Sequence, residues 1–123
     1  MSRYARPMDS DYTPRHVAEL LQDGHIQLID VRQAYEHESG RIAGDRHIEL
    51  AQLAAEADTL DRERPVVFYC RSGDRSRMAV DAFRASGWDA YAIGGGLVAW
   101  TDEGLPLEPE GAEVAHHSGL PPA

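Results

Sequence analysis

The sequence predicts an α/β fold built on a parallel sheet. Short β-type runs alternate with helical stretches along the chain, and one of these runs, Val66 to Tyr69, is apolar or aromatic at every position. A run of this kind is typical of a central parallel strand with both faces covered. Strands that alternate with helices favour parallel pairing through crossover connections. The length of 123 residues suits one globular domain with its own core.

The first half of the chain is predicted to contain a helix, a strand and a second helix. Thr13 and Pro14 form an N-cap and a first helical position, and Gly24 is a stop signal for that helix. Residues 26–31, IQLIDV, are predicted as a strand. Residues 50–60, LAQLAAEADTL, carry apolar side chains at helical spacing, which predicts a helix.

The second half repeats this order of elements. The strand 66–69 runs into a polar loop, and residues 76–86 then have helical spacing that closes at Gly87. Residues 88–93, WDAYAI, are predicted as another strand. The segment 94–100, GGGLVAW, is predicted as a turn that enters a last short helix.

These elements define a domain over residues 13–107, preceded by an N-terminal extension, 1–12. The segment from 108 to 123, EPEGAEVAHHSGLPPA, is polar and rich in proline, and we expect a loosely ordered tail. His116 and His117 lie in this tail. Two adjacent histidines without further ligands are weak support for a metal site, so no metal is predicted.

Composition excludes several classes of function. The net charge of -9 argues against nucleic-acid binding, because phosphate contacts need a basic face. No run has the roughly 18 apolar residues that a transmembrane helix needs. The first residues, MSRYARPMDSDYTPRH, contain no apolar signal region, and one cysteine cannot form an internal disulfide. These observations favour a cytoplasmic protein in a reducing compartment.

The only cysteine follows the predicted central strand. Ligands bind at the carboxyl ends of the strands in an open parallel sheet, which is where Cys70 falls. The next helix begins just after it, and three arginines, Arg71, Arg75 and Arg77, outweigh the single charge of Asp74. Backbone N–H groups, a helix N-terminus and arginines all favour the thiolate, which is the nucleophilic form of cysteine. The loop is suited to an anion that must meet a nucleophile.

A buried, inert cysteine is the alternative interpretation, and lone cysteines at strand ends are often of that kind. A structural Cys70 gains nothing from flanking guanidinium groups, however. Gly73 also indicates a backbone path that a side chain would obstruct. The loop as a whole therefore favours catalysis.

Three motifs in order resemble the rhodanese-like sulfurtransferases. The loop 70–76, CRSGDRS, resembles their active-site loop, and 28–44, LIDVRQAYEHESGRIAG, resembles their Asp-x-Arg, Glu and Gly-x-Ile-x-Gly signature. The segment 93–106, IGGGLVAWTDEGLP, is similar to their closing segment. Where the family commonly has Gly-His-Ile-Pro-Gly-Ala, this chain has GRIAGD at 40–45, which leaves the conformation of the 40–48 loop open.

The resemblance implies a single domain with a central, parallel five-stranded sheet and helices on both faces. It also implies transfer of sulfane sulfur from thiosulfate or a similar anionic donor to a thiophilic acceptor, either cyanide, a small thiol or a protein thiol. The sulfur is held as a persulfide on Cys70, the catalytic residue, without a metal or organic cofactor. The predicted substrate-binding residues are those of the loop: Arg71, Ser72, Gly73, Asp74 and Arg75.

Within that loop the backbone N–H groups are expected to surround the sulfur, while Arg71 and Arg75 hold the oxyanion end of the donor. Asp74 is expected to hold the loop or cap a helix. Residues expected to support the loop are Asp30, Arg32 and Ser76. Surface positions are expected for the histidines outside the tail: His16, His25, His37 and His47.

Two rival functions remain open. A phosphatase or arsenate reductase loop is normally one residue longer than this one, in which four residues separate Cys70 from Arg75. The shorter loop favours a single sulfur atom over a tetrahedral oxyanion. The other rival is a non-catalytic rhodanese-like module that binds or regulates a protein partner, although such modules often lack the cysteine.

Overall fold

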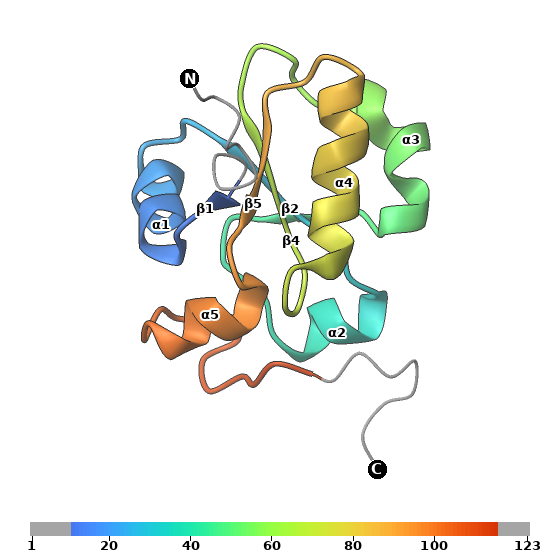
Figure 1. Ribbon diagram of the computed structural model, residues 1–123. Coiled ribbons are helices and arrows are strands. Elements are labelled where there is room, and N and C mark those ends of the chain that lie inside the picture. Colours follow the sequence, from blue (N-terminus) through green and yellow to red (C-terminus); the bar gives the residue numbers. More distant parts are fainter. Residues whose placement is uncertain (1–10, 116–123) are drawn as a thin grey trace.

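The computed structural model describes residues 11–115, which form a parallel sheet between two helical layers (Figure 1). This confirms the predicted α/β class and the five-stranded sheet. The strands lie in the order β1-β5-β4-β2-β3, and every pair is parallel. Their bounds are Asp11–Tyr12 for β1, Gln27–Asp30 for β2, Arg46–His47 for β3, Val66–Tyr69 for β4 and Ala90–Ile93 for β5.

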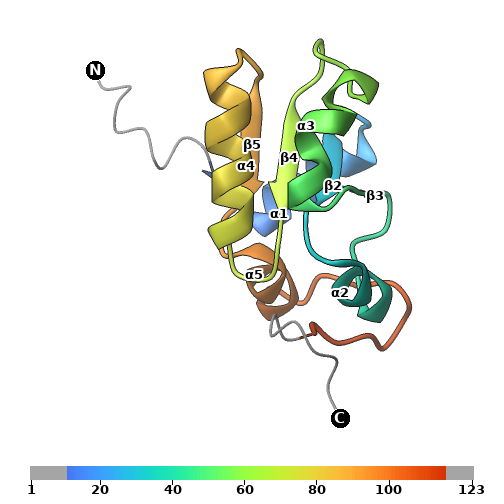
Figure 2. The ribbon, with the colours of Figure 1, turned by 90° about the vertical axis from the view of Figure 1, so that its right-hand side faces the viewer.

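Helices cover both faces of the sheet and its carboxyl edge. One face packs against α1 (Pro14–Gln22) and α5 (Gly96–Asp102), and the other against α4 (Asp74–Ala85). The short helices η3 (Leu50–Gln52), α3 (Leu53–Glu56) and η4 (Ala57–Thr59) lie beside α4. Helix α2 (Ala34–Ser39) lies at the edge where the strands end, on the same side as α5 (Figure 2).

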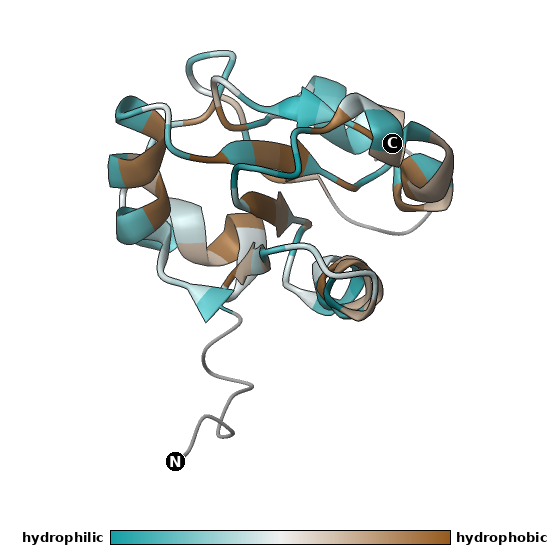
Figure 3. Ribbon diagram, turned by 90° about the horizontal axis from the view of Figure 1, so that it is seen from above, coloured by the Kyte–Doolittle hydropathy of each residue, from teal (hydrophilic) through white to brown (hydrophobic). Residues whose placement is uncertain are grey.

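The strand β4 is the centre of the sheet, as its apolar sequence predicts. It pairs with β2 on one side and β5 on the other, and its four side chains are fully buried. Val66 and Phe68 pack in the cluster with α4, whereas Val67 and Tyr69 pack in the cluster with α1 and α5. Figure 3 shows the apolar strands between the amphipathic helices. This burial fixes the point at which the chain leaves the sheet at Cys70.

The ends of α1 agree with the predicted signals. The Thr13 hydroxyl accepts a hydrogen bond from the His16 amide at 3.1 Å, and Pro14 is the first helical residue. Gly24 follows the helix with a φ of +71°, a conformation that glycine adopts most readily. No helix among the described residues combines the length and apolar character needed to cross a bilayer.

The predicted helix over 50–60 is replaced by a succession of shorter pieces, η3, α3 and η4. Leu53 and Leu60 reach the core, while Ala54 between them is exposed. A series of short helices places these leucines on one side about as well as a continuous helix does. The apolar spacing in the sequence therefore could not distinguish one long helix from several short ones. Helix α2 also lies in a segment for which no element was predicted.

The described structure continues on both sides of residues 13–107, the predicted domain. The strand β1 lies inside 1–12 and pairs with β5, so the sheet begins at Asp11. Residues 108–115 continue along the domain: the Arg41 amide donates to the Glu108 carbonyl at 2.9 Å, and the Glu108 amide donates back at 2.7 Å. His116 and His117 lie outside the described residues, and the tail prediction stays untested there.

Candidate active site at the Cys70 loop

The sulfur of Cys70 lies inside a short turn of backbone. Cys70 follows β4 directly and is only 1% exposed. The Gly73 amide donates to Sγ at 3.1 Å, and the Ser76 amide donates at 3.4 Å. Two N–H groups at the start of α4 therefore point at one sulfur atom. This arrangement stabilises negative charge on that sulfur, because the donors and the helix end are fixed before any charge forms.

Ser76, predicted to support the loop, is fully buried and links its two ends. Its hydroxyl donates to the Gly73 carbonyl at 3.1 Å and lies 3.5 Å from the Cys70 sulfur. Gly73 has a φ of +125°, outside the range that residues with side chains usually occupy. The positive φ at Gly73 turns the chain so that the amides of residues 73 and 76 both face the sulfur.

Arg75 is engaged by an acid that the sequence did not assign to the site. Its two terminal nitrogens donate to both oxygens of Glu36, at 2.7 and 3.0 Å. Glu36 comes from α2 and is fully buried. Burial alone raises the pKa of Glu36, but the hydrogen bonds from Arg75 and the Gln33 amide outweigh it and bring this pKa below its usual value. The pair ties the loop to α2.

Arg71 is placed differently from Arg75. It is half-buried, and its carbonyl accepts a hydrogen bond from the Val98 amide at 3.0 Å. Within residues 11–115 its Nε is buried without a hydrogen-bond partner. A buried donor without a hydrogen bond destabilises the folded protein, and a bound anion would accept a hydrogen bond from it. Ser72 and Asp74, the other predicted loop residues, are exposed.

The N-terminus of α5 packs directly beneath the loop. The Leu97 amide donates to the Cys70 carbonyl at 2.9 Å. A Cβ atom at Gly96 would lie 2.7 Å from that carbonyl oxygen and 2.6 Å from the oxygen of Arg71. Only glycine permits this approach, so the glycine-rich turn before α5 lets this helix pack against the base of the Cys70 loop.

Asp30 and Arg32, predicted as loop supports, form a fully buried pair at the end of β2. Nε and Nη2 of Arg32 donate to the two Asp30 oxygens at 2.9 and 2.7 Å. Burial alone raises the pKa of Asp30, but Arg32 outweighs it, so this pKa lies below its usual value. Arg32 also donates to the Gly40 carbonyl at 2.7 Å. The pair thus holds the 40–42 turn.

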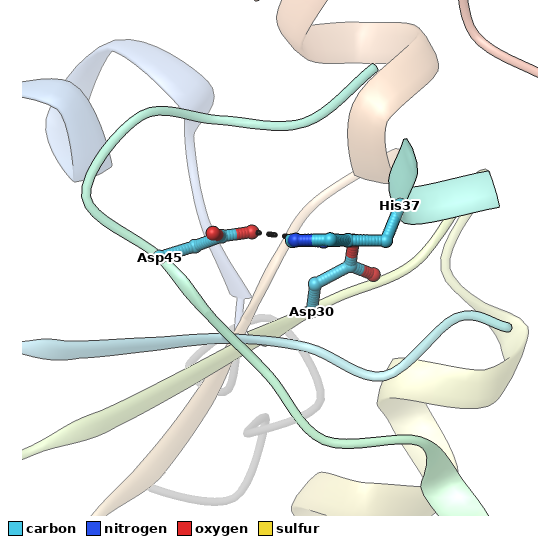
Figure 4. Close-up of side chains that lie close together, drawn as sticks. All are labelled: Asp30, His37 and Asp45. Atoms are coloured by element: carbon cyan, nitrogen blue, oxygen red, sulfur yellow. Dashed lines mark hydrogen bonds and ion pairs between the residues drawn. The ribbon is translucent and has the colours of Figure 1, made fainter. Parts of the chain in front are cut away.

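His37 and His47, expected on the surface, are instead part of a polar cluster beside that pair. The two rings stack with centroids 4.5 Å apart, and Nδ1 of His37 lies 2.9 Å from an Asp30 oxygen. Asp45 approaches the same nitrogen at 3.6 Å (Figure 4). The ligand atoms of Asp30, His37 and Asp45 are close enough to surround a metal ion. Both Asp30 oxygens already accept hydrogen bonds from Arg32, however, so this carboxylate is poorly placed to coordinate a metal ion as well.

Comparison with known proteins matches most of this chain to one family. The family model of the rhodanese-like domain covers residues 13–103. The chain is 30% identical to the thiosulfate sulfurtransferase GlpE of Actinobacillus succinogenes, over 80% of this chain and 90% of that protein. It is 38% identical to the HTH-type transcriptional regulator Rv0324 of Mycobacterium tuberculosis, over 80% of this chain but only 46% of that longer protein.

A solved structure gives the same result for the fold. The rhodanese-related protein of Thermoplasma volcanium is 26% identical in sequence, with a TM-score of 0.75, and the alignment covers 81% of this chain and 98% of that one. The region matched by the family model contains the strands β2 to β5, the Cys70 loop and α5. The chain therefore belongs to the rhodanese-like domain family, whose members include named sulfurtransferases.

Proposed function

We propose that this protein is a sulfurtransferase that moves sulfane sulfur from thiosulfate, or a similar anionic donor, to a thiophilic acceptor through a persulfide on Cys70. The observation that carries this proposal is the pair of amides, from Gly73 and Ser76, that donate to the Cys70 sulfur. The single free thiol of the chain fits a reducing compartment such as the cytoplasm.

In the first half-reaction the Cys70 thiolate attacks the outer sulfur of thiosulfate. A new S–S bond forms, the bond between the outer sulfur and the sulfonate sulfur breaks, and its electron pair leaves with sulfite. The amides of Gly73 and Ser76 stabilise the charge on the sulfur. Arg71 holds the sulfonate end, because its Nε needs an acceptor, whereas Arg75 is held by Glu36.

In the second half-reaction the acceptor attacks the outer persulfide sulfur. Cyanide gives thiocyanate, and a thiolate gives a new persulfide; in each case the electron pair of the broken S–S bond returns to Cys70 as thiolate. The donor's sulfonate has left by then, so this step depends on access to the persulfide and not on Arg71.

Mass spectrometry of the intact protein tests the proposal. Thiosulfate without an acceptor should add one sulfur atom to Cys70, and cyanide should then remove it as thiocyanate. The Cys70→Ser variant is the control and should gain no mass. Wild-type protein that stays unmodified with thiosulfate, a persulfidated small thiol and mercaptopyruvate alike would support the alternative of a non-catalytic protein-binding module.

The phosphatase or arsenate reductase alternative has less support from the site. An oxyanion of that kind needs the arginine that closes the loop, and here Arg75 already donates two hydrogen bonds to the buried Glu36. We expect hydrolysis of aryl phosphates to be far slower than sulfur transfer. Phosphate ester hydrolysis that outpaces sulfur transfer would replace the sulfurtransferase proposal.

A further inference from the structure

Helix α2 joins the sulfur loop to the polar cluster at the end of β2. Two consecutive residues make the two connections. Glu36 binds Arg75 of the loop through both carboxylate oxygens, and His37 places Nδ1 within 4 Å of the carboxylates of Asp30 and Asp45. Figure 4 shows the His37 ring reaching from α2 toward both acids. His37 and Arg75 are therefore connected through a six-residue helix.

Charges around His37 are unequally balanced. Arg32 neutralises Asp30 through two hydrogen bonds. Within residues 11–115, the side chain of Asp45 accepts one hydrogen bond, from the Tyr69 hydroxyl at 2.7 Å, and it is nearly buried. Burial raises the pKa of Asp45 above its usual value. A protonated His37 supplies the cation that this carboxylate lacks, and it can donate to Asp30 as well.

Other titratable or charged groups face His37 from each neighbouring element. His47 stacks on its ring from β3, and Tyr69 reaches the cluster from β4 through Asp45. Arg41, just beyond α2, donates to the His37 carbonyl at 3.2 Å and not to its ring. Of these groups only the histidines normally change charge between about pH 5 and 8. His47 is bound elsewhere, with Nε2 2.7 Å from the Arg32 carbonyl.

We propose that His37 is a positioning residue whose protonation holds α2 in place and, through Glu36 and Arg75, sets the geometry of the Cys70 loop. When His37 loses its proton, Asp45 has no cation beside it and Asp30 and Asp45 repel each other. The attraction between His37 and these two acids, which keeps α2 in place, then weakens. Arg75 lies near enough to Cys70 for their charges to interact. The reactivity of the Cys70 thiolate therefore depends on the charge of His37. The inference rests on the proposed function only in taking Cys70 as the reacting group.

Alkylation of Cys70 by iodoacetamide, measured from about pH 5 to 9, tests this inference without any sulfur donor. NMR of the imidazole signals locates the titration of His37. The wild-type rate should show the ionisation of Cys70 and a second inflection that coincides with the His37 titration. The second step should change the rate of the thiolate about fivefold, the lower end of common coupling between sites.

The variants separate His37 from a general effect of histidines or of folding. His37→Gln should show one inflection, whereas His25→Gln, a change at an exposed histidine on another edge, should keep both. Asp45→Asn should make the second inflection smaller, because it removes the carboxylate whose interaction with the His37 ring depends on the charge of that ring. A second inflection that persists in His37→Gln, or that is missing from the wild type while His37 titrates, would overturn the inference. Alkylation needs no sulfur transfer, so the experiment still tests the role of His37 if the protein proves not to be a sulfurtransferase.

Discussion

Glu36 and Arg75 are 39 residues apart in the chain and share two hydrogen bonds, at 2.7 and 3.0 Å, with the carboxylate fully buried. The pair makes α2 a support of the sulfur loop. It also distinguishes the two arginines of the loop: Arg75 has a protein partner, whereas the Nε of Arg71, within the described residues, has none. We therefore expect substitutions of Arg75 and of Arg71 to affect turnover and stability differently.

Arg75→Ala should destabilise the protein and damage both half-reactions. The substitution leaves the Glu36 carboxylate buried without its partner, and breaking a buried ion pair in this way typically costs about 3 kcal/mol or more. Urea unfolding measures the loss, and rapid-mixing assays measure persulfide formation and decay separately. An Arg75→Ala protein of wild-type stability would contradict a structural role for the pair.

Arg71→Ala should weaken donor binding and leave stability nearly unchanged. One charged hydrogen bond to the sulfonate is lost, so the KM for thiosulfate should rise about tenfold. The rate of sulfur release from a preformed persulfide should stay the same, since the sulfonate has then departed. Ser72→Ala, at the exposed neighbouring position, serves as the control and should alter neither quantity. Equal slowing of both steps by Arg71→Ala would show that the arginine shapes the loop instead.

Gly96→Ala should disrupt the loop more than a comparable change elsewhere. The new Cβ would lie within 2.7 Å of two carbonyl oxygens at the base of the loop. Gly104→Ala is a matched control, because Gly104 also has a positive φ, +78°, but no atom within 4 Å of its added Cβ. The backbone strain is similar in the two variants, so the additional loss of Tm and of Cys70 alkylation rate in Gly96→Ala measures the close approach. Identical losses in both variants would remove the packing argument.

The stabilising effect of Glu36 should depend on pH in a defined direction. Its folded-state pKa lies below its usual value, so the unfolded chain binds the proton more readily. The stabilisation by ionised Glu36 is fully present above the pKa of glutamate in the unfolded chain, ~4.3. It is lost as the pH falls through the lower pKa of Glu36 in the folded protein. The difference in unfolding free energy between wild type and Glu36→Gln should therefore shrink from pH 7 to pH 3. The exposed Glu19→Gln provides the comparison, with a small difference at both pH values.

The parts of the structure that could be predicted from the sequence are those encoded locally. Val66 to Tyr69 identified the central strand, because a strand buried on both faces must be apolar throughout. Thr13 and Pro14 marked the start of α1 through capping chemistry that acts within a few residues. The Cys70 loop could be located because its arginines and glycine lie next to the thiol in the chain.

The parts that could not be predicted depend on distant residues. Nothing near Arg75 in the sequence shows that Glu36 will bind it, since the fold brings α2 to the loop. The environment of His37 likewise depends on Asp45, which comes from the next connection. The two-residue strands β1 and β3 are too short to produce an alternating pattern, and only their neighbours in the sheet define them.

The two hydrogen bonds that reach the Cys70 sulfur from amides come from the main chain, at Gly73 and Ser76. Their geometry is therefore set by the path of the backbone and does not depend on the side chains on the outside of the loop. Ser72 and Asp74 are exposed and can be exchanged without disturbing it. The side chains on the outside of this loop can therefore be redesigned, or can diverge, while the two amides keep their positions around the Cys70 sulfur.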